Sequence, residues 1–144
     1  MTEIEERLIS VRERIARTGR NPDDIAIVAV TKGFGPETCR AALDAGLRVL
    51  GENRVHEAKL KMEVVPNAEW HLIGHLQTNK VRQVVGRFAL IHSVDSARLA
   101  AELARGDPQQ AVLLEVNVAR EAQKHGVDPD RAMEAIIECR ACSS

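Results

Sequence analysis

The sequence predicts an α/β fold in which short parallel strands alternate with helices. Three observations support this: apolar, β-branched runs recur along the chain, amphipathic stretches lie between them, and no hairpin turn joins them. The expected strands begin at residues 27, 47, 69, 89 and 112, which is one strand about every 21 residues. This rhythm is typical of both a (β/α) barrel and a doubly wound sheet, and it does not decide between them.

The elements are expected in a regular order. A first helix covers residues 3–17, where apolar side chains recur at helical spacing: Ile4, Leu8, Val11 and Ile15. Five buried strands follow, at residues 27–31, 47–50, 69–73, 89–92 and 112–118. Further helices are expected near residues 36–45, 53–64, 78–86, 96–105 and 130–140. Charged side chains of the second of these are expected to form ordinary solvated surface: Glu57, Lys59, Lys61 and Glu63.

Length, composition and charge limit the class of protein. The 144 residues suffice for one domain. With 20 Lys and Arg against 21 Asp and Glu, one Trp, two Phe and no Tyr, the chain lacks the basic, aromatic surface of a nucleic-acid binder. No apolar run approaches the roughly 18 residues of a membrane span, and the charged start does not resemble a signal peptide. We therefore expect a cytoplasmic protein that binds neither nucleic acid nor a membrane.

Polar residues collect where each expected strand ends. They are Lys32, the Gly-Glu-Asn run at 51–53, Gly74 and His75, the Ser-Val-Asp-Ser run at 93–96, and Asn117. In barrels and in doubly wound sheets, the carboxyl ends of the strands form the edge where ligands bind. Helix N-termini at the same edge offer N–H groups to anions. The sequence thus predicts a small anionic ligand at this edge.

Lys32 is the first candidate site residue. It directly follows an apolar, β-branched run, and such a neighbourhood favours the neutral amine that a Schiff base with an aldehyde requires. The alternative is a lysine that extends from the strand end into solvent, which the local pattern by itself favours.

The loop after Lys32 also suggests a dinucleotide-binding turn. Gly33 and Gly35 form a Gly-x-Gly after a strand, and Glu52 ends the next strand. However, Thr38 replaces the third glycine, and a proline and a glutamate open the helix where a pyrophosphate requires N–H groups and no negative charge. Dinucleotide binding is therefore a minor alternative.

Two histidines, His71 and His75, have the spacing of a metal pair. On a strand, residues four apart lie about 13 Å apart at about 3.3 Å per residue, so both cannot bind one ion. We therefore expect no metal site. His75 alone is expected either to contact a ligand or to cap the helix that begins near Thr78.

Several segments together resemble one known family. They are Ala-Val-Thr-Lys at 29–32, Gly-Glu-Asn at 51–53, Trp-His-Leu-Ile-Gly-His-Leu-Gln-Thr-Asn-Lys at 70–80, Ile-His-Ser-Val-Asp-Ser at 91–96, and Asn117-Val118 followed by Glu121, Lys124 and Gly126. In this order and spacing they closely resemble the pyridoxal phosphate homeostasis proteins, which are related to the N-terminal barrel of alanine racemase. The resemblance runs from about residue 4 to the last residue.

The resemblance implies a (β/α)8 barrel of the TIM type, of fold type III among proteins that bind pyridoxal 5′-phosphate (PLP). Lys32 matches the family's Schiff-base lysine, and Asn53 matches an asparagine near the cofactor. The family acts in vitamin B6 and amino-acid homeostasis without established turnover, so no catalytic residue is expected. The implied partners are PLP and PLP-dependent apoenzymes, and the implied state of the full-length protein is a monomer. A PLP-dependent racemase or decarboxylase of the same fold type is the alternative function.

The sequence departs from the family pattern in three places. Arg54 stands where the family commonly has an aromatic residue, and the loop at 33–36 is looser than usual. The family's phosphate cradle, a serine and a glycine-rich turn with an arginine, has no counterpart in residues 118–144. Eight units of about 21 residues after the first helix require roughly 190–200 residues. Residues 1–144 are therefore expected to be the N-terminal portion of a single barrel, about its first five β/α units, without the C-terminal strands.

Overall fold

The computed structural model describes residues 1–142, so the last two residues of the expected domain lie outside this range. The helices are α1 (Glu3–Arg17), α2 (Pro36–Asp44), α3 (Val55–Val64), α4 (Ala97–Gly106) and α5 (Ala132–Ala141). The strands are β1 (Val28–Val30), β2 (Val49–Glu52), β3 (Glu69–Leu72), β4 (Leu90–Val94) and β5 (Val112–Leu114). Short 3-10 turns occur at η1 (Pro22–Asp24), η2 (Thr78–Gln83) and η3 (Pro129–Arg131).

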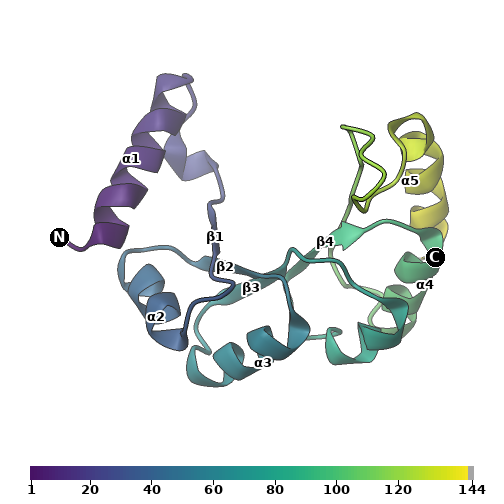
Figure 1. Cartoon of the computed structure of the whole chain (residues 1–144), viewed down its shortest axis with the longest axis horizontal. Helices are drawn as coiled ribbons and strands as arrows, with labels where there is room; N and C mark the ends of the chain where they lie inside the picture. The colour runs from purple at the N-terminus through teal and green to yellow at the C-terminus, as the bar shows by residue number, and fades with distance from the viewer. Residues whose placement is uncertain (143–144) are drawn as a thin grey trace.

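The sheet has the strand order β1-β2-β3-β4-β5, and each pair of neighbours is parallel. In a doubly wound sheet the order reverses at a switch point, whereas in a barrel each strand is added beside the previous one. The sequential order therefore decides between the two architectures in favour of the barrel. Figure 1 shows the result as an arch, with α2, α3 and α4 around the outside of the sheet and α1 and α5 at its two ends.

Two expected elements differ in the structure. The helix expected near 78–86 is only the 3-10 turn η2, and the chain then turns at Gly86, whose φ is +74°. The strand expected at 112–118 ends at Leu114, and Val116 forms an isolated parallel bridge with Val127. The first segment buries Val81 and Val84, three residues apart as suits a 3-10 turn, and the second leaves the sheet to form a loop. The other expected strands and helices are confirmed, with ends that differ by at most two residues.

The two faces of the sheet have different neighbours. Leu50 pairs in register with Trp70 and Glu52 with Leu72, and all four side chains are buried. Because Glu52 contacts Lys61 of α3, these side chains face the helix layer. Side chains alternate along a strand, so Gly51 and its register partner His71 belong to the inner, concave face of the arch. The hydrophobic core thus lies between the sheet and the outer helices.

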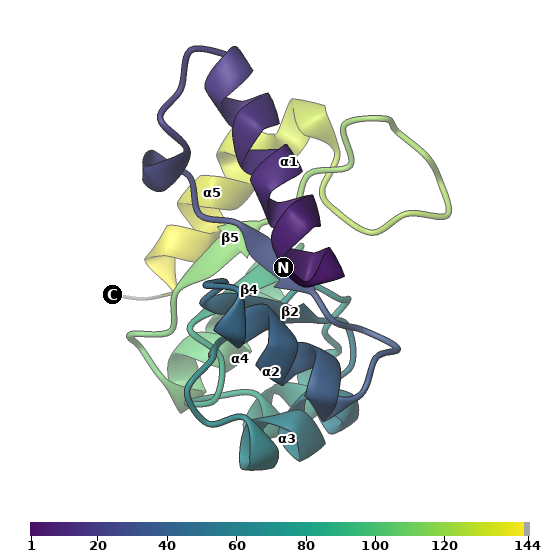
Figure 2. The same ribbon diagram turned by 90° about the vertical axis from the view of Figure 1, so that its left-hand side faces the viewer.

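The first helix, α1, is stabilised at its start and lies at the edge of the arch. Thr2 and Glu5 form a capping box, in which the Thr2 side chain accepts from the Glu5 backbone and the Glu5 side chain accepts from the Thr2 backbone. None of the residues of α1 is fully buried. Figure 2 shows α1 in front of α5, above the sheet. No helix within residues 1–142 is long and apolar enough to cross a membrane.

Candidate functional site at the carboxyl ends of the strands

Lys32 stands at the carboxyl end of β1 and is exposed. The residue before it, Thr31, continues the sheet, because its N–H donates to the Gly51 carbonyl over 3.0 Å. The Thr31 hydroxyl donates to a Glu52 carboxylate oxygen over 2.5 Å, so this side chain faces the helix layer. Lys32 itself lies in the turn that the Phe34 N–H closes by donating to the Thr31 carbonyl over 3.1 Å. The apolar shielding that the sequence suggested for the Lys32 amine is not seen, because the preceding strand is short and lies at the sheet edge.

Asn53 stands beside Lys32 at the same edge. Val30 pairs with Gly51 in the parallel register, and Lys32 and Asn53 each follow two residues later. The end of β2 also packs closely on the end of β3: a Cβ atom built on Gly74 would lie 2.2 Å from the Asn53 carbonyl oxygen. Only a glycine fits at this contact. The structure therefore brings the two expected site residues to adjacent strands.

A buried ion pair lies directly behind these residues. Lys61 Nζ lies 2.5 Å from Glu52 Oε1 and donates to the Thr31 carbonyl over 2.8 Å. Glu52 is 0% exposed, and its second oxygen has no hydrogen-bond partner among the described residues, so this carboxylate depends on Lys61. The expectation that Lys61 is solvated surface is wrong. The charged residues of α3 look alike in sequence, and only the tertiary position of Glu52 distinguishes Lys61 from its neighbours.

The same ion pair bears on the dinucleotide alternative. In that interpretation, Glu52 hydrogen-bonds a ribose hydroxyl of the ligand. Instead, its carboxylate is fully buried against Lys61 on the helix side of the sheet. Glu52 therefore cannot serve a ligand at the open edge, and the structure gives no support to dinucleotide binding.

A chain of polar groups lies on the inner face. The Glu69 carboxylate accepts from His71 Nε2 over 2.9 Å, and His71 Nδ1 lies 2.9 Å from His92 Nε2. The tautomers of the two imidazoles decide which of them donates in the contact between His71 and His92. Burial, together with the neighbouring His71, lowers the pKa of His92 below its ordinary value of 6.5. These contacts could not be predicted from the sequence, because Glu69 and His71 lie on β3 whereas His92 lies on β4.

His75 does not cap the following turn. The N-cap of η2 is Gln77, without a side-chain capping bond. Instead, Nδ1 of His75 lies 3.7 Å from Oδ2 of Asp95, and its ring stacks on that of His125 with centroids 3.6 Å apart. Both partners come from later parts of the chain, and the pattern around His75 gave no sign of them.

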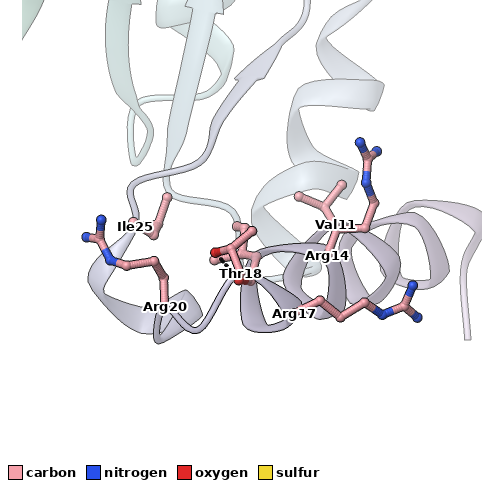
Figure 3. A pocket seen from close by; sticks show the side chains of 7 residues that line it. Val11, Arg14, Arg17, Thr18, Arg20 and Ile25 are labelled. Atoms are coloured by element: carbon pink, nitrogen blue, oxygen red, sulfur yellow. Dashed lines mark hydrogen bonds between the residues drawn. The ribbon is translucent and has the colours of Figure 1, made fainter.

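A hollow of about 630 Å³ lies away from the strand ends, at the C-terminal end of α1. Three arginines line it, Arg14, Arg17 and Arg20. Figure 3 shows that the Arg17 and Arg20 side chains extend in opposite directions, so their guanidinium groups do not converge on one anion. The strand ends therefore remain the candidate site.

Comparison with known proteins finds relatives that share one name. A protein named "Pyridoxal phosphate homeostasis protein" from Aquifex aeolicus (strain VF5) is 42% identical over 139 residues, which cover 90% of this chain and 61% of that protein. The protein of the same name from Escherichia coli (strain K12) is 36% identical over 140 residues, which cover 88% of this chain and 60% of that protein. The chain thus spans about three fifths of the length of these relatives, and the resemblance seen in its motifs is confirmed.

Solved structures resemble the fold as well. The structure of PipY, the COG0325 family member of Synechococcus elongatus PCC7942, without PLP has a TM-score of 0.83 and 35% identity, over 97% of this chain and 66% of that one. PipY with PLP bound has a TM-score of 0.78 and 35% identity, over 94% and 63%. The family model described as "Alanine racemase, N-terminal domain" matches residues 7–144. Sequential parallel strands, a lysine after the first of them and this nearly complete match lead to one conclusion: the chain belongs to the alanine racemase N-terminal domain family.

Proposed function

We propose that this chain is part of a PLP-binding protein of vitamin B6 and amino-acid homeostasis, and that it holds PLP covalently through Lys32. The observation that carries the proposal is the position of Lys32, an exposed amine beside Asn53 at the ligand-binding edge of the barrel strands. The names of the two relatives and the PLP bound to PipY support it.

The residues at this edge fit the reactive end of PLP. When bound, PLP supplies an aldehyde that condenses with a lysine amine. Lys32 provides an accessible amine, and Asn53 provides an amide that both donates and accepts hydrogen bonds one strand away. The buried Lys61 is hydrogen-bonded on the other side of the sheet, which leaves Lys32 as the amine at this position.

We further propose that residues 1–144 are the N-terminal portion of the barrel and that later strands hold the phosphate. Both β1 and β5 are edge strands of the sheet, and a closed barrel pairs such edges. Val30 and Leu113, on these edges, are each 47% exposed, and additional strands would cover them.

Borohydride trapping tests the attachment. The purified protein is incubated with PLP, reduced with borohydride and digested, and the modified lysine is identified by mass spectrometry. We expect modification of Lys32 and its loss in Lys32→Ala. Lys80→Ala, which removes another exposed lysine, is the matched control and should retain the adduct. Stoichiometric labelling of another lysine in the unaltered protein would overturn the proposal.

The proposed role is carriage of PLP and not turnover, because racemisation requires an acid or base on each face of the cofactor. The alternative is a racemase or decarboxylase that uses the same lysine. Alanine and other amino acids are incubated with the PLP-loaded protein, and D-amino acids and amines are measured. We expect neither. Rapid turnover that disappears in Lys32→Ala would replace the carrier function with the enzymatic one.

The last part of the proposal concerns the location of the protein, its oligomeric state and the recipients of PLP. We propose a cytoplasmic monomer that passes PLP to PLP-dependent apoenzymes. Transfer is measured as recovery of activity when a loaded protein is mixed with an apoenzyme, against an equal concentration of free PLP. Recovery no faster than with free PLP would argue against direct transfer, and light scattering of the protein tests whether it is monomeric.

A further inference from the structure

Three potential metal ligands meet where three successive strands end. His75 follows β3, Asp95 follows β4, and His125 lies in the loop after β5. One ligand atom of each residue lies within 4.8 Å of the others. His75 Nδ1 and Asp95 Oδ2 are 3.7 Å apart, and the rings of the two histidines stack with 8° between their planes. Because the strands are sequential neighbours, this cluster is built into the order of the sheet.

The loop that carries His125 is held at both ends. The Val127 N–H donates to the Glu115 carbonyl over 2.8 Å, and the Asn117 N–H donates to the Val127 carbonyl over 2.9 Å. Gly126, next to His125, has a φ of +107°, and a Cβ built on it would lie 2.7 Å from the Asn117 nitrogen. These contacts fix the backbone on either side of the loop, so the position of His125 near His75 is set by the fold.

Ion pairs between Arg120 and two aspartates add a second constraint on the same loop. Arg120 donates to both carboxylate oxygens of Asp128 over 3.0 Å and to Asp130 over 3.0 Å. Arg120 itself adopts a φ of 55°, which is uncommon for a residue with a side chain. The ion pairs hold this turn, although they are exposed to solvent. The loop thus positions His125 through backbone and ionic contacts that do not involve its imidazole ring.

We propose that His75, Asp95 and His125 bind one divalent transition-metal ion of the Zn²⁺ class. Two imidazoles and a carboxylate are a ligand set that Zn²⁺ favours, at about 2.0–2.2 Å from each atom. Tetrahedral geometry then requires about 3.4 Å between ligand atoms, close to the separation of His75 from Asp95. The ligand atom of His125, which lies within 4.8 Å of the others, must move inward by up to about 1.4 Å, which its exposed side chain achieves by rotation.

The metal also changes the arrangement of the two rings. The nitrogen lone pairs lie in the plane of an imidazole, so two parallel, stacked rings direct them within two parallel planes that do not meet at one ion. Binding therefore rotates at least one of the two exposed rings and abolishes the stack between His75 and His125. Three protein ligands leave a fourth position for water or an anionic group. The three ligands do not include Lys32, so metal binding can be measured without PLP.

His71, which lies within β3, is not a suitable ligand. Both ring nitrogens of His71 already have partners, Glu69 Oε1 and His92 Nε2, each at 2.9 Å. The fifth histidine, His56, is exposed at the start of α3, where it serves as a matched control. The expectation of no metal site considered only His71 and His75, whereas the proposed partners of His75 come from two other strand ends.

Metal titration tests the proposal. The protein, as expressed from its own gene, is stripped with a chelator and titrated with Co²⁺ by absorbance and with Zn²⁺ by calorimetry, without PLP. We expect one ion per chain. Loss of a direct ligand in His75→Ala, Asp95→Asn or His125→Ala should weaken binding by at least about 10-fold, because even second-shell changes cost about 10–100-fold. His56→Ala should bind as the unaltered protein does.

Two outcomes would overturn the proposal. One is the absence of stoichiometric binding in the unaltered protein. The other is binding that survives all three ligand changes, which would place the ion elsewhere. Far-UV circular dichroism shows that the variants remain folded, as expected for partly or fully exposed positions. Imidazole nitrogen NMR provides a second measurement, because Zn²⁺ should shift the signals of His75 and His125 and leave those of His56 unchanged.

Discussion

The two sides of the first two strand ends differ sharply in their surroundings. Thr31 and Glu52 face the helix layer, where they are buried and hydrogen-bonded with Lys61. Their successors in the chain, Lys32 and Asn53, are more open to solvent: Lys32 is exposed and Asn53 is half-buried. Residues adjacent in sequence therefore have opposite environments at these strand ends. One side stabilises the fold, and the other offers reactive groups.

Replacement of the two lysines should give the largest contrast between these sides. Lys61→Met leaves Glu52 as an uncompensated buried charge, which should lower the free energy of unfolding by about 3–5 kcal/mol. Lys32→Met changes an exposed side chain and should alter it by less than about 0.5 kcal/mol. Urea unfolding measures both. Equal losses in the two variants would remove the distinction between the sides.

A smaller change on the side that faces the helices tests how much the Thr31 hydroxyl contributes to stability. Thr31→Val keeps the shape but removes the bond donated to Glu52, and a hydrogen bond to a charged group contributes about 1.5–3 kcal/mol. Urea unfolding should show a loss of that size. Thr38→Val, on α2, is the control and should stay within about 0.5 kcal/mol. A Thr31→Val protein of unchanged stability would mean that Lys61 alone satisfies the carboxylate.

A change on the open side should affect the site more than the fold. A Cβ added in Gly74→Ala would lie 2.2 Å from the Asn53 carbonyl, so the backbone must shift, at a cost of about 1–3 kcal/mol. Because the shift falls on Asn53, PLP affinity should fall as well. In Gly106→Ala the new atom meets only the Val85 side chain, which can rotate, and PLP affinity should not change. Unaltered PLP binding in Gly74→Ala would show that Asn53 has no role.

The smallest expected effect is the pH dependence that His92 gives to the inner face. Burial, with His71 beside it, lowers the pKa of His92 below 6.5 in the folded protein. The unfolded chain then binds more protons as pH falls through 6.5, so this contribution to stability is present above 6.5 and declines toward the folded pKa. Urea unfolding at pH 7.5 and 5.5 should show a smaller loss in His92→Gln than in the unaltered protein. An identical loss in both would assign the pH dependence to other groups.

Much of the fold could be predicted because it depends on local pattern. The apolar runs and their spacing indicated all five strands, but the choice of a barrel required the strand order, which no local pattern contains. The helix expected near 78–86 was wrong because its buried side chains, Val81 and Val84, lie three residues apart, a spacing that a 3-10 turn satisfies as well as an α-helix.

The candidate site was only partly predictable for the same reason. Lys32 and Asn53 were indicated by their places at strand ends, and the register brings them together. The burial of Lys61 depends on Glu52, nine residues earlier, and the neighbours of His75 depend on two later loops. Such pairings arise from the assembled fold, so a single sequence does not reveal them.

The sequential order of the strands has a consequence for folding during synthesis. Each strand pairs with the one made just before it, so every new contact closes a loop of about 20 residues at a modest entropic cost. A chain of this kind has few contacts that must wait for distant segments. During synthesis, the sheet can therefore grow from β1 to β5 in the order in which the ribosome releases them.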